Sequence, residues 1–565
     1  MSRPVSNAVK TSTYKVKQKN GDIYVLERKS IYDPKKGYTR SLGTKLIGKI
    51  PAGQTEMVPT RPRRKKNDSE KPVATRQRVG LTQILQWIGR ESGIDEDLFE
   101  SADTATAQKI LTLAHYWLAT GGQTLPHIEG WQLSHPIPYE HGITENVYHR
   151  LFAELGRDEQ TQQGYFKARA ARLDPAPAIA FDSTTISTYS HQQIEARQGF
   201  NKAVDGLNTI KLLTLFSVET HQPIAFAKQP GNLPDVTSIA NTLRQLEFLD
   251  LKRPLIVTDN GYYRQQNITE FTRDYTQFLT LGNMDVTWIQ EHFQAHREEL
   301  ETISSICPFD HTIHGITVPV KHEISWERQR SRGQAKASDV VKEEHRYYLH
   351  FFLNRNNVAK DEIRLSDTLM ELKEQVEQGK ELSNAAQKRA QKYLTVSKRG
   401  GKVDVKFNEE AIRQARKNYG YFVLVSNKTM GCFEALDTYR LREKVEEAFK
   451  VHKDRLDGTR ARVWYGDNLR GRMFVQFVGL GYYCFLQHRI NELKNSLGKA
   501  EGLTKEQLNA ELGLKRWLEQ RSLGQILDWF DCVEETTVQT KAGKIRWSTE
   551  STERDRLFLS KLGVI

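Results

Sequence analysis

Two short apolar runs in this 565-residue chain each end in an aspartate. The first is AIAF, followed by Asp182 and then by Ser and two Thr residues; the second is PLIVT, followed by Asp259. Short uninterrupted apolar runs of this kind predict buried strands, and the following Asn260 and Gly261 predict a turn. The sequence therefore predicts two carboxylates, each carried by a buried strand to an edge of a sheet.

Further strand-like and helix-like segments surround these two runs. The expected strands are 177–181, 209–217, 222–228, 254–258 and 277–281. A helix is expected at 234–246, between the third and fourth strands. The periodicity of these segments predicts a mixed α/β fold, and it does not by itself distinguish one such fold from another.

A third carboxylate lies in the patterned stretch YRLREKVEEAFKVHK, residues 439–453. Counted from Tyr439, the residues Arg442, Glu446 and Lys453 follow at offsets of three, seven and fourteen. At about 100° per residue, all four side chains project within roughly 60° of one another on a single helix. A carboxylate flanked by cations suits a metal ion beside a phosphodiester, because the carboxylate can hold the metal while the cations hold phosphates.

Each of the three acids also has a purely structural interpretation. An aspartate at a strand end, such as Asp182, commonly caps a helix or turn, and Asp259 before Asn and Gly could form an Asx-turn. Glu446 lies among charged neighbours that could form a solvated face of i,i+4 pairs. These neighbours are Glu443, Lys444, Glu447 and Lys450. None of these alternatives explains why the three acids occur together with the rest of the patterned stretch.

The patterned stretch resembles the YREK signature of bacterial insertion-sequence transposases of the DDE cut-and-paste class, and all four positions match. That family likewise has an aspartate followed closely by Ser or Thr at its first site, and Asp-x-Gly-aromatic at its second. The resemblance covers roughly residues 175–495. It implies a ribonuclease-H-like α/β core in which Asp182, Asp259 and Glu446 are the catalytic and metal-binding residues.

The resemblance also implies a mechanism based on two Mg²⁺ ions, for which Mn²⁺ can substitute. Hard cations prefer oxygen ligands, which three carboxylates provide. Asp182 would bridge both ions, while Asp259 and Glu446 would each hold one. Such a site can activate water or a DNA 3′-hydroxyl and stabilise the leaving oxygen. The implied reaction cleaves insertion-sequence ends, through a hairpin in this class, and joins them to target DNA.

Other residues would contact the DNA in the same family. Three members of the signature would grip phosphates near the cut and near a flipped nucleotide: Tyr439, Arg442 and Lys453. An aromatic side chain of the insertion would stack on the flipped base, and the candidates are Trp326 and Trp288. Trp326 is favoured because Arg328 and Arg330 lie beside it in sequence. Either tryptophan could instead anchor the hydrophobic core of the insertion.

The spacing of the motifs predicts the domain organisation. Between Asp259 and Glu446 lie 186 residues, more than a bare ribonuclease-H-like core needs, so a mostly β insertion with a helical hairpin at about 365–393 is expected. The expected parts are a basic β-rich DNA-binding module (1–55), a basic linker (56–79), a helical module (80–172), the two parts of the core (173–283 and 426–500), the insertion (284–425) and a helical C-terminal dimerisation region (501–565). The helical module could bind transposon-end DNA or serve as a scaffold between domains.

Nearly all of the excess positive charge lies at the start of the chain. The net charge is +13, yet residues 1–80 hold 20 Lys and Arg against 6 Asp and Glu, and the remainder holds 63 against 64. This distribution indicates a DNA-binding arm on a near-neutral body. The linker cluster is expected to contact phosphates, although a solvated linker could have the same composition. The cluster comprises Arg61, Arg63, Arg64, Lys65 and Lys66.

The cysteines and the apolar segments indicate where the protein works. Four cysteines, Cys307, Cys432, Cys484 and Cys532, form no CxxC pair, which argues against a zinc site and for a reducing compartment. The first ten residues lack the apolar core of a signal peptide, and no run of 18 apolar residues could span a membrane. We therefore expect a cytoplasmic protein that does not bind membranes. The resemblance implies that it is bacterial and associated with the nucleoid.

The expected partner is double-stranded DNA, both as transposon terminal inverted repeats and as target. The resemblance implies a homodimer that holds two ends in a synaptic complex and cleaves in trans. Two other functions compete with this one. A metal-dependent nuclease could share the core without strand transfer, and a non-catalytic DNA-binding derivative could retain the fold, although unpaired carboxylates would then repel DNA.

Overall fold

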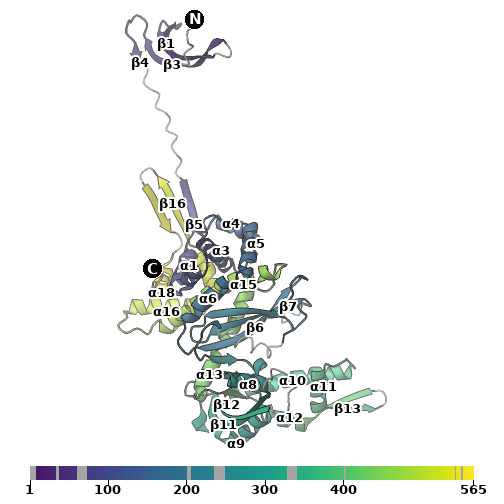
Figure 1. Ribbon diagram of the computed structural model, residues 1–565. Helices are drawn as coiled ribbons and strands as arrows, with labels where there is room; N and C mark the ends of the chain where they lie inside the picture. Colours follow the sequence, from purple (N-terminus) through teal and green to yellow (C-terminus); the bar gives the residue numbers. More distant parts are fainter. Residues whose placement is uncertain are drawn as a thin grey trace. The chain divides into compact units, whose positions relative to one another are not determined.

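The computed structural model describes residues 8–33, 37–59, 73–199, 205–233, 248–327, 340–399, 402–540, 543–548 and 551–565 (Figure 1). They belong to two compact units, one of residues 1–74 with 538–545 and the other of residues 75–537 with 546–565. Three parts of the sequence prediction lie outside the described residues. These are the helix at 234–246, the basic cluster Arg61 to Lys66, and the pair Arg328 and Arg330.

The first unit contains a four-stranded sheet of order β1-β2-β3-β4. Its strands are β1 (Lys10–Lys17), β2 (Ile23–Asp33), β3 (Tyr38–Ile50) and β4 (Val58–Pro59). β1 and β2 form an antiparallel hairpin around Asn20 and Gly21, and Gly21 has a φ of +86°. β4 and β5 (Val73–Arg78) lie at the two ends of the segment expected to be a linker.

The helical character predicted for residues 80–172 is confirmed. The helices are α1 (Gly80–Glu91), α2 (Ile94–Ser101), α3 (Thr104–Thr120), α4 (Ile128–Gln132), α5 (Glu145–Arg157) and α6 (Glu159–Ala171). Asp103 caps α3 by accepting hydrogen bonds from the backbone N–H groups of Ala105 and Thr106. The helix ends at Gly121, whose φ of +68° fits the left-handed cap expected of a glycine.

A mixed eight-stranded sheet forms the centre of the second unit, in the order β11-β12-β15-β10-β9-β6-β7-β8. The five strands expected around the two aspartates are confirmed as β6 (Ala178–Thr188), β7 (Asn208–Ser217), β8 (Pro223–Pro230), β9 (Leu255–Thr258) and β10 (Gln277–Leu281). β9 pairs in parallel with both β6 and β10, whereas β6, β7 and β8 pair antiparallel. Helices α8 (Gln265–Arg273) and α9 (Thr287–Leu300) flank β10 in the sequence.

Three strands of the expected insertion continue this same sheet. β11 (Ile313–Glu327), β12 (Val340–Asn354) and β15 (Tyr421–Ser426) extend it beyond β10 through antiparallel pairing. Phe351, Phe352 and residues 423–425 are buried, so these strands need neighbours that a small separate module could not supply. The rest of the insertion has a small core of its own. Its elements are α10 (Arg355–Glu377), α11 (Asn384–Tyr393), β13 (Leu394–Arg399), β14 (Lys402–Phe407) and α12 (Glu409–Arg416).

The long helix α15 (Gly466–Ser496) is largely buried. It crosses α5 at two glycines, because a Cβ on Gly471 would overlap the Phe152 carbonyl and one on Gly156 would overlap the Asp467 carbonyl. The helical C-terminal region expected at 501–565 contains α16 (Lys505–Glu519), α17 (Leu523–Asp531) and α18 (Glu553–Leu562). Between α17 and α18 lie the strands β16 (Glu534–Thr540) and β17 (Gly543–Ser548). Within the described residues, no helix is both long and apolar enough to cross a membrane.

Candidate active site

The register of two parallel strands brings Asp182 and Asp259 together. Ala178 pairs with Leu255 and Ala180 with Val257, so two further residues along each chain place the two aspartates side by side. Neighbouring strands lie about 4.8 Å apart. The expectation that Asp182 ends its strand was wrong, because the β-branched residues after it continue β6 and Asp182 pairs with Thr214 of β7.

The backbone of the next residue orients each aspartate. The Ser183 N–H donates to Asp182 Oδ1 at 2.7 Å, and the Asn260 N–H donates to Asp259 Oδ1 at 2.7 Å. Asp259 also caps the short 3₁₀ turn Asn260–Tyr262 that follows β9, so the capping role considered from the sequence is present. In each aspartate the hydrogen bond to the next N–H occupies only Oδ1, so the other carboxylate oxygen, Oδ2, can still bind another group.

The patterned stretch is not one continuous helix, and that expectation is corrected. It forms α13 (Cys432–Leu441) and α14 (Glu443–Asp454), with a break at Arg442. The Arg442 N–H donates to the Tyr439 carbonyl at 3.1 Å and the Val445 N–H to the Arg442 carbonyl at 2.9 Å. Both bonds join residues three apart, which is the tighter 3₁₀ pattern. Arg442 therefore enters the site from a turn between two helices.

Arg442 gathers the three carboxylates around a single guanidinium. Its Nη1 donates to Asp182 Oδ2 at 3.1 Å and its Nη2 to Glu446 Oε1 at 3.2 Å. Nη2 also lies 3.8 Å from Asp259 Oδ1. The Arg442 side chain is only 6% exposed, whereas that of Glu446 is 61% exposed. The three acids expected from the sequence are thus neighbours, and a buried cation lies between them.

Tyr439 joins this cluster and Lys453 does not. The Tyr439 hydroxyl donates to Asp259 Oδ1 at 3.2 Å, and the Arg442 guanidinium lies 5.6 Å from the centre of the Tyr439 ring. Lys453 lies in the last turn of α14, about 10 Å along the helix from Glu446. Its side chain is not among those that line the cavity at the carboxylates.

The carboxylates open into a cavity of about 430 Å³. Sequence reasoning missed several residues of its wall, including Lys211, whose Nζ donates to the Leu233 carbonyl at 2.5 Å. A lysine within the apolar run TIKLLTLFS was the signal that could have revealed it. Gly199 and Gly231 also line the cavity, and a Cβ on Gly199 would overlap the Gly231 carbonyl, so the backbone there approaches too closely for a side chain.

Burial and charge shift the pKa values within the cluster. Burial raises the pKa of Asp182 to about 6, although the Arg442 guanidinium and the Ser183 N–H oppose the rise. Burial disfavours the charge on Arg442, yet the carboxylates of Asp259, Asp182 and Glu446 outweigh it and raise the Arg442 pKa. Burial also raises the pKa of Tyr439, so its hydroxyl remains a donor at neutral pH.

The donor set of the cluster suits a hard divalent cation. Asp182, Asp259 and Glu446 present oxygen ligands only, which Mg²⁺ prefers over sites built from His or Cys. Across the described ranges, no three His, Cys, Asp or Glu side chains are already close enough to hold a metal. The cation that the three carboxylates share is the Arg442 guanidinium. The chemistry therefore fits Mg²⁺ once Arg442 moves aside.

The two tryptophans considered for base stacking both contact the protein itself. Trp288 stacks on His322 with ring centres 4.3 Å apart and planes 16° apart. Trp326 lies in β11 opposite Val341 and is partly buried against the main hydrophobic core. Neither ring lines the cavity at the carboxylates. These contacts are what the core-anchoring alternative expects, and stacking on a base stays a prediction.

Comparison with known proteins adds one family. The family model described as "Transposase DDE domain" matches residues 174–478, just over half of the chain. No curated protein matches. Among solved structures, the chain is similar to piggyBac transposase in the cryo-EM structure of its synaptic complex with hairpin DNA, at 7% identity and a TM-score of 0.33, with 79% of this chain and 81% of that chain covered.

Proposed function

Because the chain belongs to the transposase DDE domain family, we propose that it is a DNA transposase that binds insertion-sequence ends, cleaves them and joins them to target DNA. One observation carries the proposal. Asp182, Asp259 and Glu446 lie 77 and 187 positions apart in sequence order, yet all three contact the same Arg442 guanidinium inside the matched region. One acid would be enough to neutralise a structural arginine, so the presence of a second and a third acid beside Arg442 indicates a further role for the cluster.

The topology of the central sheet supports a ribonuclease-H-like core. The order β8-β7-β6-β9-β10 places three antiparallel strands beside two parallel ones, with Asp182 on the middle strand and Asp259 after the next. In this proposal residues 173–283 and 426–500 form the core, and residues 284–425 are inserted between β10 and α13. The YREK assignment rests on Tyr439 and Arg442, which contact the acids.

Asp182, Asp259 and Glu446 would hold Mg²⁺, or Mn²⁺ in its place. When bound, the divalent cations would activate the attacking oxygen and neutralise charge that develops on the leaving oxygen. The cluster itself prepares the ligands, because the backbone N–H groups after both aspartates fix their orientation. The exposed Glu446 side chain can adjust, since α14 presents it at the mouth of the cavity.

The remaining signature residues would act on the DNA. Arg442 can exchange its carboxylate partners for two oxygens of a phosphate, which its planar fork binds equally well. Tyr439 keeps its proton, holds Asp259 and can donate to a phosphate once Asp259 binds metal. Lys453, two helical turns beyond Glu446, would bind a phosphate farther from the cut. Trp326 remains the proposed stacking partner for a flipped base.

The other partners follow from charge and from the requirement to hold two DNA ends. The basic arm of residues 1–80 would bind terminal repeats through phosphate contacts, which makes its affinity steeply salt-dependent. A homodimer that cleaves in trans would hold both ends, and a hairpin intermediate would release the element. The helical module of residues 80–172 would bind end DNA or support the core.

The test is a cleavage assay on a labelled duplex that carries the element's own end. Purified full-length protein is incubated with Mg²⁺ in three forms, wild type, Glu446→Gln and Glu443→Gln. Glu443 is an exposed acid on the same helix, outside the cavity, so it matches the charge change without touching the site. We expect nicks or hairpins at the end with wild type and Glu443→Gln, and none with Glu446→Gln.

Other results would favour the competing functions. Cleavage without joining to a target duplex would indicate a nuclease of the same fold. Tight end binding by wild type without cleavage in Mg²⁺ or Mn²⁺ would contradict the catalytic role and indicate a DNA-binding derivative. If nicks form without hairpins, the proposed transposase function stands, and the proposed hairpin intermediate is wrong.

A further inference from the structure

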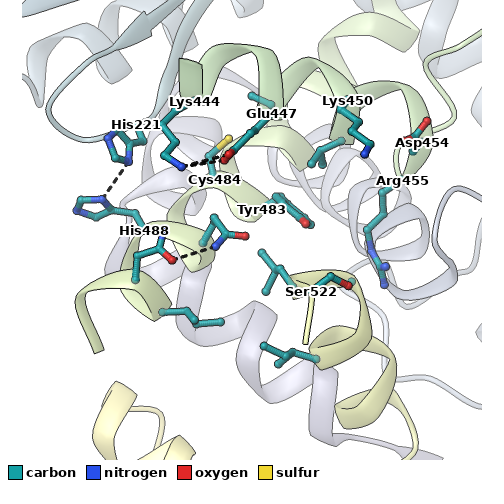
Figure 2. Close-up of a pocket in the computed structure, with 18 of the residues that line it drawn as sticks. His221, Lys444, Glu447, Lys450, Asp454, Arg455, Tyr483, Cys484, His488 and Ser522 are labelled. Carbon is teal, nitrogen blue, oxygen red and sulfur yellow. Dashed lines mark hydrogen bonds and ion pairs between the residues drawn. The ribbon is translucent and has the colours of Figure 1, made fainter. Parts of the chain in front are cut away.

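A second cavity lies on another face of the helix that carries Glu446. It has a volume of about 420 Å³ and is enclosed by α14, α15 and the start of α17 (Figure 2). Glu447, Val451 and Asp454 of α14 line it and project about 80–140° around the helix from Glu446, while Lys450, one turn beyond Glu446, projects about 40° from it. No residue lines both this cavity and the one at the carboxylates. A ligand could therefore occupy it without entering the proposed cleavage site.

The second cavity has more positive charge than its acids can balance. Five Lys and Arg side chains line it, against the two carboxylates of Glu447 and Asp454. Lys444 pairs with Glu447 at 3.1 Å and Arg455 with Asp528 at 2.6 Å. The other three make no ion pair within the part of the chain that the structure describes. They are Lys450, Lys494 and Arg521.

These three cations are placed to bind an anion. Lys494 is partly buried in the wall, and this burial lowers its pKa, although the Glu519 carboxylate opposes the fall. The Arg521 guanidinium lies 4.8 Å from the centre of the Trp517 ring, which holds its position. Lys450 of α14 and Tyr483 of α15 both line the cavity (Figure 2). Asp454 also lines the cavity, so the three cations leave a net charge near +2, which matches a phosphate monoester with a charge near −2.

The walls of the cavity are apolar and of small-molecule size. They include Val451 of α14, Tyr483 and Ile490 of α15, and Leu523 and Ile526 of α17. A cavity of 420 Å³ falls in the range typical of ligand sites, about 300–1,000 Å³. Inorganic phosphate alone would leave these walls uncovered, so the geometry favours an anion with a flat apolar body.

Two amide side chains add a polar edge to the wall. Gln487 and Asn491 lie one turn apart on α15, and Gln487 Nε2 donates to Asn491 Oδ1 at 3.3 Å. This leaves the Gln487 carbonyl oxygen and the Asn491 amide hydrogens without a hydrogen-bond partner among the described residues. One free acceptor beside one free donor complements the amino group and ring nitrogen of an adenine edge.

We propose that this cavity binds a nucleoside monophosphate, either free or as the terminal nucleotide of a DNA strand. The base lies between the apolar walls with its polar edge on Gln487 and Asn491. The phosphate binds Lys450, Lys494 and Arg521. The proposal goes beyond the cleavage reaction, because none of these residues contacts the three carboxylates.

The test measures binding to the full-length protein by titration calorimetry, without divalent metal. Adenosine 5′-monophosphate is compared with adenosine and with inorganic phosphate, each of which supplies half of the recognised chemistry. We expect the monophosphate to bind about tenfold or more tightly than either fragment. The double variant Lys450→Gln and Lys494→Gln should weaken it by about tenfold or more. Lys499→Gln, which removes an exposed lysine outside the cavity, should not change the affinity.

Two further measurements distinguish a free nucleotide from a DNA strand end, and ligand binding in this cavity from DNA cleavage at the carboxylates. A 5′-phosphorylated single-stranded hexanucleotide that binds more tightly than the free monophosphate identifies a strand end as the source, and the reverse order identifies a free nucleotide. Glu446→Gln should abolish DNA cleavage and leave monophosphate binding unchanged, so the two proposals fail separately. The proposal is overturned if neither adenosine 5′-monophosphate nor the phosphorylated hexanucleotide binds at millimolar concentration. It is also overturned if the double variant binds adenosine 5′-monophosphate as tightly as wild type does.

Discussion

The Arg442 guanidinium lies 3.1 Å from the Asp182 carboxylate, and both side chains are largely buried. If either partner of a buried ion pair is removed, the other is left charged and poorly solvated, and this makes the removal destabilising. Here the same guanidinium also serves Glu446 and Asp259. Arg442 thus takes the central position that a metal would need, so in the proposed function a metal and Arg442 would compete for the same oxygens.

Replacement of Arg442 by Ala should strengthen metal binding while it abolishes DNA cleavage. The three carboxylates lose their shared cation, so we expect the metal-free variant to be less stable by about 1–3 kcal/mol, with half-exposed Asp259 and Glu446 limiting the cost. Calorimetric titration with Ca²⁺ should show higher affinity than wild type. Arg440→Ala, which removes a guanidinium that makes no ion pair with these acids, is the control. Weaker Ca²⁺ binding by Arg442→Ala would contradict the competition.

The raised pKa of Asp182 should make its contribution to stability depend on pH. Because the folded-state pKa is about 6 and the unfolded value is about 3.9, the contribution is complete below the unfolded pKa and is lost as pH rises toward 6. From pH 4 to pH 7 the loss is about 2 kcal/mol. Urea unfolding of metal-free wild type and Asp182→Asn at both pH values measures it. The variant should lack this decline, and parallel pH curves for the two proteins would refute the assignment.

Tyr439→Phe should separate the hydroxyl of this residue from its ring. The variant loses the 3.2 Å hydrogen bond to Asp259 and keeps the ring beside Arg442. We expect a stability loss of about 1 kcal/mol and slower cleavage with end binding retained. Tyr465→Phe, at a side chain that is 61% exposed, should change neither quantity. Cleavage at the wild-type rate would show that the hydroxyl has no part in the site.

The crossing of α5 and α15 should be intolerant of any side chain. Gly471→Ala would force a methyl group into the Phe152 carbonyl, and overpacking of this kind costs about 1–3 kcal/mol. Gly513→Ala is the matched control, because Gly513 also lies within a helix but has open space around its Cβ position. It should be neutral or stabilising by up to about 1 kcal/mol. Thermal unfolding of both variants compares them directly.

Local sequence patterns predicted most of the strands and helices of this chain, because each apolar run of β6 to β10 is short, buried and bounded by turn residues. Two features depended on tertiary context. The break at Arg442 has no Gly or Pro to mark it, and it accompanies contacts to acids on two distant strands. The attachment of β11, β12 and β15 to β10 is a matter of strand order, which the sequence of an individual strand does not encode.

The site residues divide in the same way. Asp182, Asp259 and Glu446 could be named as candidates because acids after apolar runs and in a patterned stretch can be recognised in the sequence. Lys211 was passed over because it lies inside an apolar strand, where its burial and its bond to Leu233 become visible only in three dimensions. The cleavage assay tests the proposed catalytic roles of the three acids.

The contacts of Arg442 also determine when the three carboxylates come together. Three carboxylates would repel one another and spread apart if nothing neutralised them. With a guanidinium supplied by the chain itself, folding alone assembles the acids, and the conformational entropy of placing them is lost before DNA or metal arrives. The acids are therefore preorganised, and a metal ion that binds as proposed would need only to replace one counterion with another.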